Sequence, residues 1–300
     1  MELWIGTKDG LRKTPADSPI EIEGEAITAI AVEGTARWAI VGGRALRRSA
    51  DGGVWETLAS LQDLRANCLL PTSSGVLVGT SEARLMRHSG GALEVVEGFG
   101  RVAHRDGWYT PWGGPPDVRS LAGNASTLFA NVHVGGIPRS RDGGDSWEPT
   151  VDIDADVHQV LAHEGWVLAA AARGLLTSED DGESWLLADE GLHGSYCRAV
   201  AVAGDTVLLS ASTGPFSRQA AVYRRPLGSD GEFERCRNGL PEWFGENVDT
   251  ACVVATGEAA AVGTSDGSVF LSEDRGGSWS AVATGLPSVT CLALSELPTC

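Results

Sequence analysis

Short apolar segments separated by turn residues recur along the whole chain. Seven of them are rich in small side chains and read AITAIAV, ANCLLP, VRSLAG, VHQVLA, CRAVAV, VDTACVV and VTCLAL. Between them lie further apolar pairs, such as TLFANV with GIPRS and WVLAAAA with GLLTS. Segments of this length, bounded by Gly, Asp and Ser, indicate β-strands. The pattern therefore predicts an all-β chain.

These segments form a repeat. One small-residue segment and the unit behind it span about 40 residues, a period typical of four-stranded propeller blades. The chain holds seven such segments and seven units, which predicts a seven-bladed β-propeller of four-stranded blades. Small side chains suit the innermost strands, because the blades taper toward the propeller axis.

The two ends of the repeat are each incomplete. The last segment, at residues 289–294, has no unit after it, and the first unit, from Leu3, has no segment before it. We therefore expect the N- and C-terminal strands to pair in one blade, which closes the ring and removes two exposed edges. The predicted single domain covers residues 1–300, with blade units at about 289–300 plus 1–24, 25–60, 61–98, 116–152, 156–190, 195–238 and 247–286, and an inserted loop at 99–117.

One turn sequence occurs four times, as SADGGVW (49–55), SRDGGDSW (140–147), SEDDGESW (178–185) and SEDRGGSW (272–279). An Asp side chain can accept backbone N–H groups across a turn, Gly supplies the backbone freedom, and Trp folds back as an apolar plug. The residues predicted to have this structural role are Asp51, Asp142, Trp147, Asp180, Trp185, Asp274 and Trp279.

The repeated turn resembles the Asp-box, or bacterial neuraminidase repeat. In that family the box is a structural turn of β-propeller blades, found in sialidases, other glycosidases and non-enzymes. The catalytic pattern of sialidases includes an early Phe-Arg-Ile-Pro stretch, whereas the nearest string here, GIPRS (136–140), places the Arg after Ile-Pro. Sialidases also have six blades, so the resemblance implies the fold and carries over no catalytic residue.

The seven inner segments share a polar position near their start. These residues are Thr28, Asn67, Arg119, His158, Arg198, Asp249 and Thr290. The first strand of every blade starts on one face, so the sequence predicts a polar ring around the axis on this ring face. Second strands end on the same face and bring His133 there, while the repeated turns lie on the opposite face. Asn67, Arg119, His133 and Arg198 are the predicted ligand-binding residues of the ring.

Three long connections on the ring face carry aromatic residues. They are GWYTPWGGPPDVRS (107–120), ADEGLHGSYC (188–197) and NGLPEWFGEN (238–247). Their Trp108, Tyr109, Trp112, Tyr196 and Trp243 are predicted ligand contacts, with the first loop as a lid and side wall of an axial site. The alternative is that this loop plugs the tunnel and its tryptophans pack on blade edges.

The ring chemistry favours an anion. Guanidinium groups bind carboxylate or phosphate in a bidentate manner. Asp249 and Glu246, with His158, are the candidate catalytic acids and bases of a hydrolase or lyase. The spacing of the histidines matches no metal-binding motif, so we predict no metal and no cofactor. A ring of polar residues is also common in propellers simply because the tunnel holds water.

Charge and composition narrow the partners. The net charge of −17 argues against nucleic acid and anionic membranes as partners. The sequence has no membrane-length apolar run, and its six cysteines are scattered singly. The first ten residues, MELWIGTKDG, lack a basic region followed by an apolar one, so we expect no signal peptide. We expect a cytoplasmic monomer with buried, reduced thiols.

The leading functional hypothesis is a propeller that binds a small anionic or sugar-like ligand in the axial cleft, with hydrolase or lyase activity left open. One alternative is a sialidase-like glycoside hydrolase. The other is a protein-interaction scaffold without a pocket. Fold alone does not choose among them.

Overall fold

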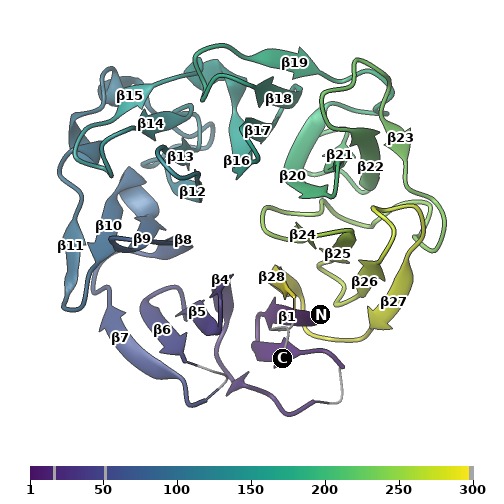
Figure 1. Cartoon of the computed structure of the whole chain (residues 1–300), viewed down its shortest axis with the longest axis horizontal. Helices are drawn as coiled ribbons and strands as arrows, with labels where there is room; N and C mark the ends of the chain where they lie inside the picture. Colours follow the sequence, from purple (N-terminus) through teal and green to yellow (C-terminus); the bar gives the residue numbers. More distant parts are fainter. Residues whose placement is uncertain (16–17, 51–52, 297–300) are drawn as a thin grey trace.

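The chain folds into a ring of blades. The computed structural model describes residues 1–15, 18–50 and 53–296. In this described part, the strands form seven four-stranded antiparallel sheets arranged around a central axis (Figure 1). The predicted seven-bladed β-propeller is therefore confirmed. Asp51, assigned from the sequence to the first repeated turn, lies outside the described residues.

The strands of each blade run in order from the axis outward. The innermost strands are β4 (Ile27–Glu33), β8 (Ala66–Thr72), β12 (Val118–Gly123), β16 (Val157–His163), β20 (Tyr196–Ala203), β24 (Val253–Thr256) and β28 (Val289–Ser295). The second strands are β1 (Glu2–Thr7), β5 (Ala36–Val41), β9 (Gly75–Thr80), β13 (Leu128–Val132), β17 (Trp166–Ala171), β21 (Thr206–Ser212) and β25 (Ala259–Gly263).

Beyond these lie the two outer strands of each blade. The third strands are β2 (Gly10–Lys13), β6 (Ala45–Ser49), β10 (Leu85–His88), β14 (Pro138–Ser140), β18 (Gly174–Ser178), β22 (Ala221–Pro226) and β26 (Val269–Ser272). The outermost strands are β3 (Ile22–Glu23), β7 (Glu56–Ser60), β11 (Leu93–Val95), β15 (Glu148–Pro149), β19 (Leu186–Ala188), β23 (Glu234–Arg235) and β27 (Ser280–Ala283). Four 3₁₀ turns are also described: η1 (Ser81–Ala83), η2 (Phe99–Arg101), η3 (Arg105–Gly107) and η4 (Ile153–Ala155).

The ring closes through its two ends. β28 pairs antiparallel with β1, with Leu3 opposite Leu294 and Ile5 opposite Leu292. In Figure 1 the first and last colours of the chain meet in this one blade. The predicted closure is therefore confirmed: β1 has a hydrogen-bonded strand on both sides, and β28 takes the innermost position of this blade.

The core lies between neighbouring blades. Second strands such as β17 and β25 are buried at nearly every position, because both faces of each blade pack on another blade. The five described cysteines are all free and buried within this core, as the sequence predicts. No helix in the described ranges is long and apolar enough to cross a membrane.

The repeated turns connect third strands to outermost strands. In the turn after β14, Asp142 accepts hydrogen bonds from Ser140 Oγ (2.8 Å) and Ser146 N (2.9 Å). Trp147 donates from Nε1 to Gly144 O at 3.0 Å and is buried. The turns around Asp180 and Asp274 repeat this carboxylate network. Each of these turns thus hydrogen-bonds its own carboxylate and contributes one Trp to the space between blades.

One of these tryptophans departs from the pattern. Trp279 is buried and donates to Gly276 O (3.1 Å), as Trp147 does in its own turn. Trp185 is only half-buried, and its Nε1 has no hydrogen-bond partner among the described residues. The repeated sequence therefore predicts the turn better than it predicts the depth of the tryptophan.

Candidate functional site

The residues of the predicted ring sit at irregularities of the innermost strands. The pairing of β12 with β13 passes from Val118 directly to Ser120, and Arg119 has no partner opposite it. The same break occurs in the other ring strands at Thr28, Asn67, His158, Arg198 and Thr290. A β-bulge re-aims the side chain of its extra residue and bends the strand. Bulges therefore set the direction of these six ring side chains.

Asp249 is the exception to this arrangement. The sequence predicts a strand from residue 248, but β24 begins only at Val253. Ala251 has a positive φ of 62°, which an L-residue in a strand does not adopt. Asp249 thus lies in a turn before the strand, and its Oδ1 is 2.8 Å from Arg198 Nε.

Three ring residues tie neighbouring blades together. Asn67 Nδ2 donates to Val118 O (3.3 Å), and Thr290 Oγ1 donates to Ile27 O (2.5 Å). His158 Nδ1 lies 2.6 Å from Cys197 O, so this nitrogen carries the proton. Each acceptor directly precedes the bulge of the next blade. The main role of these three side chains is therefore to hydrogen-bond one blade to the next.

Arg119 differs from these three residues. Its side chain lines an axial cavity of about 610 Å³ on the ring face. No hydrogen bond or ion pair of its guanidinium is present among the described residues. Burial lowers the pKa of Arg119, and the nearby Arg198 guanidinium lowers it further. The Asp156 and Asp117 carboxylates act on it only from a distance and partly oppose this lowering. A largely buried cation that no carboxylate contacts is the least satisfied charge of the ring.

The axial cavity concentrates positive charge in an acidic protein. Its described lining includes four cations and three carboxylates: Lys8, Arg65, Arg119 and Arg198, with Asp117, Glu246 and Asp249. The whole chain has 23 Lys and Arg against 40 Asp and Glu. The cavity therefore reverses the overall balance, and a concave site focuses this local field.

A buried cluster adjoins the arginines. Asp156 Oδ1 lies 3.5 Å from His133 Nε2 and 3.6 Å from His158 Nε2. Burial is the main cause that lowers the pKa of His133 to about 4 and of His158 to about 3, with help from the arginines. Burial also raises the pKa of Asp156, against the effect of Arg119 and Arg198. Both imidazoles are therefore neutral at neutral pH.

The inserted loop covers part of this region. Trp112 is 63% exposed, and its ring centroid is 5.4 Å from that of His133. Tyr109 is also exposed. Trp108 is different, because it is 9% exposed and packs on Phe99 at 5.9 Å between ring centroids. The sequence placed Trp108 at the ligand surface, and the structure places it in the core.

None of the five predicted aromatic contacts, Tyr109 and Trp112 included, is in the described lining of the axial cavity. The half-buried Tyr196 ring packs on His158 at 4.7 Å. Trp243 lies under the Arg235 guanidinium (3.8 Å) and beside His193 (4.6 Å). Trp243 is thus part of the packing between loop and blade, and we remove it from the candidate ligand contacts.

The candidate catalytic residues are not assembled around one point. His158 is fully buried and does not line the cavity. Asp249 and Glu246 do line it, and Asp249 is engaged by Arg198. Proton transfer by His158 to a ligand in this cavity is therefore not supported by the geometry.

Sequence reasoning missed two charged residues of this site. Asp156 lies directly before β16, two positions ahead of the aligned ring position, so the alignment passed over it. Arg65 lies in the connection before β8. The available signal was that charged residues in connections leading to inner strands reach the ring face. In the described residues, no group of three or more His, Cys, Asp or Glu is placed to hold a metal ion.

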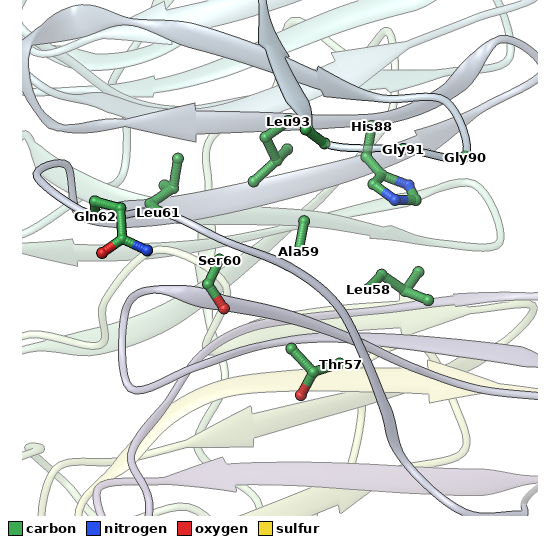
Figure 2. A pocket seen from close by; sticks show the side chains of 11 residues that line it. Thr57, Leu58, Ala59, Ser60, Leu61, Gln62, His88, Gly90, Gly91 and Leu93 are labelled. Atoms are coloured by element: carbon green, nitrogen blue, oxygen red, sulfur yellow. The ribbon is translucent and has the colours of Figure 1, made fainter.

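A second large cavity lies elsewhere. It measures about 660 Å³ and is lined by residues of β7 and the turn after β10 (Figure 2). Among its described lining residues, His88 is the only titratable side chain, flanked by glycines and small or apolar groups such as Leu58 and Ala59. This space between two blades thus offers no charged group to orient a ligand, and the axial cavity is the better candidate site.

The fold and the axial cavity define the molecule as a seven-bladed β-propeller with a cation-lined ring face. No protein-family model and no curated protein matches the sequence. Solved structures do resemble it. The computationally designed protein Ika8 has a TM-score of 0.65 and 14% identity, covering 98% of this chain and 87% of that chain.

Two further solved structures are also similar to this chain. An ancestral GH74 enzyme has a TM-score of 0.61 and 13% identity over 90% of this chain, which spans only 37% of that enzyme. YCF48, solved bound to D1 peptide, has a TM-score of 0.59 and 14% identity, covering 91% of this chain and 85% of that chain. At these identities the likeness extends to the fold alone.

Proposed function

We propose that this protein is an Asp-box-type propeller that binds a small anionic ligand, such as a carboxylate or a sugar acid, in its axial cavity. The observation that carries the proposal is Arg119, a mostly buried guanidinium that faces the cavity with no partner among the described residues. Leaving such a charge unpaired is costly, and an anion of the ligand would satisfy it.

The neighbouring groups support the same ligand class. Lys8, Arg65 and Arg198 line the cavity beside Arg119. Arg198 is held by Asp249, so its remaining nitrogens stay available in a fixed orientation. The glycosidase alternative has weaker support, because the similar GH74 enzyme shares only the fold and the candidate acid–base residues are not brought together.

The test is binding of named anions to matched variants. Succinate, citrate, glucuronate and inorganic phosphate are titrated by calorimetry at fixed salt into the wild type, Arg119→Ala and Arg119→Lys. Removing the guanidinium should cost about 2–5 kcal/mol of binding free energy for whichever anion binds. Lysine should not restore it, since an ammonium lacks the bidentate fork.

Arg173→Ala is the matched control. Arg173 is an exposed arginine at the end of β17 on the same face, and it does not line the cavity. Its loss should leave affinity unchanged. If all four proteins bind these anions equally, or none binds any of them, the proposed anion site is wrong.

A further inference from the structure

One phenylalanine on the ring face is almost completely exposed. Phe216 is 89% exposed in the loop between β21 and β22. It lines a hollow of about 330 Å³ together with Arg198 and Arg218. This hollow shares Arg198, Glu246, Asn247 and Asp249 with the axial cavity. The two hollows therefore adjoin each other, and we treat them together as a depression that ends at an exposed aromatic ring.

The loop that carries Phe216 is held by hydrogen bonds from outside it. Asn247 Nδ2 donates to Gly214 O (3.1 Å) and Pro215 O (3.0 Å). On the C-terminal side of Phe216, His193 Nε2 lies 2.9 Å from Gln219 O. A fixed loop thus presents Phe216 to solvent. Covering an apolar side chain of this size removes apolar surface from water and therefore favours binding.

The position of Phe216 selects the kind of ligand. A small molecule is usually enclosed by its pocket, and a ring this exposed at the rim contributes little to such an enclosure. Aromatic residues and Arg are enriched in protein–protein interfaces. Among the described residues, every exposed aromatic ring belongs to a ring-face loop: Tyr109, Trp112 and Phe216. The surface around the cavity therefore suits an occupant that extends over the rim.

Charge complementarity specifies the occupant further. Arg218, Arg65 and Lys8 have no ion pair within the described part of the chain, in addition to Arg119. The remaining surface is strongly acidic and repels other acidic groups. An acidic segment is thus accepted at this depression and disfavoured elsewhere on the molecule.

We infer that the ring face docks a short acidic peptide segment of a partner protein, with a carboxylate on Arg119 and an adjacent apolar side chain on Phe216. This inference rests on the proposed anion site and names what presents the anion. Phe216 and Arg218 supply the contacts that a free small anion does not use.

The test is a selection from a displayed library of random dodecapeptides on the intact protein. Enriched peptides should pair Asp or Glu with a neighbouring apolar residue. One enriched peptide, labelled with fluorescein, is then measured by anisotropy. Phe216→Ser and Arg119→Ala should each weaken it at least about tenfold, as hot-spot residues do. Arg218→Ala should weaken it less, since that side chain lies at the solvent-exposed rim.

Leu186→Ser is the matched control, because Leu186 is an exposed apolar residue of the outermost strand β19. It should change peptide affinity by less than about twofold. Circular dichroism confirms that each variant is folded. Succinate and citrate binding is measured in parallel with Phe216→Ser, which should bind them as the wild type does.

The outcomes separate the two proposals. If succinate or citrate binds through Arg119 but no acidic peptide is enriched, or Phe216→Ser binds the peptide normally, the docking inference is wrong and the anion site stands. If an enriched peptide binds independently of Arg119, the inference is also overturned. If neither peptide nor small anion depends on Arg119, both proposals fail.

Discussion

The two faces of the ring use the same antiparallel blades in different ways. On the face of the repeated turns, each of the three described Asp residues is bonded within its own turn, as Asp274 is to Ser272 and Ser278. On the ring face, polar side chains such as His158 bond to the next blade, and Arg119 bonds to nothing in the described residues. The repeated turns thus satisfy their own carboxylates, whereas the unsatisfied charge lies at an unrepeated position, Arg119.

The largest expected effect lies on the face of the repeated turns. Trp147→Ala and Trp279→Ala should each lower the free energy of unfolding by about 3–5 kcal/mol, because they remove buried rings that fill the space between blades. Trp185→Ala should cost less, since that ring is half-buried. Chemical denaturation measures these values.

Anion affinity of the same variants sharpens the comparison. Calorimetry under conditions where Trp147→Ala and Trp279→Ala remain folded should give wild-type affinity, because both tryptophan side chains lie on the face opposite the axial cavity. A loss of affinity without a loss of stability would show that the two faces are not separate in function.

The pH dependence of the unfolding free energy should also distinguish the two faces. His133 and His158 have folded pKa values of about 4 and about 3, lowered first by burial. Below their ordinary pKa of about 6.5, the unfolded chain takes up protons that the folded chain refuses. The free energy of unfolding should therefore fall between about pH 6.5 and 4, by roughly 2–3 kcal/mol for each histidine at about 1.4 kcal/mol per pKa unit.

Asp156 opposes this trend, since its raised pKa favours the folded state as pH falls. The repeated turns respond at lower pH: hydrogen bonds from serines lower the pKa of Asp180 and Asp274 to about 2, so their contribution is lost only below about pH 4. His158→Asn keeps a donor toward Cys197 O. It should reduce the fall in unfolding free energy between about pH 6.5 and 4, where His133 still titrates, and leave the fall below pH 4 unchanged. An unchanged slope in that variant would contradict the assignment to His158.

The fold was predictable because it depends on periodic features. Small-residue strands, the repeated turns and the unpaired ends determine the blades and the closure, and each is visible locally in the sequence. The bulges were not visible in the sequence, and neither was the difference between the side chains that they carry. Asn67 and Thr290 bond to the next blade, whereas Arg119 faces the cavity. A one-residue irregularity in pairing leaves no compositional signal.

Side-chain depth in the loops was the other limit. Trp108 looks like Trp112 in the sequence, since both lie in one unrepeated stretch rich in Pro and Gly. Phe99, in the 3₁₀ turn η2 of the same insertion, provides the partner that buries Trp108. Such a contact within an aperiodic segment depends on tertiary packing, which periodicity cannot predict.

A smaller effect tests the carboxylate of the repeated turn. Asp274→Ala removes the acceptor of Ser272 Oγ and Ser278 N at an exposed site. The loss should be about 1 kcal/mol of unfolding free energy, as for other exposed capping side chains. Thermal denaturation of Asp274→Ala beside Trp279→Ala measures the ratio. A larger loss of unfolding free energy in Asp274→Ala than in Trp279→Ala would mean that the hydrogen bonds of the turn stabilise the outer strands more than the buried Trp does.

The smallest effect on stability is expected at Trp112, and it decides what the inserted loop does. Trp112 is mostly exposed and its ring packs beside His133, so Trp112→Ala should change the unfolding free energy by less than about 0.5 kcal/mol. If the loop is the side wall of the anion site, this variant should still weaken binding of the anion that Arg119 holds. Tyr109→Ala, at the exposed base of the same loop, provides the comparison. Wild-type affinity in both variants would leave the loop as a structural cap over His133 and would restrict the binding surface to the cations of the cavity.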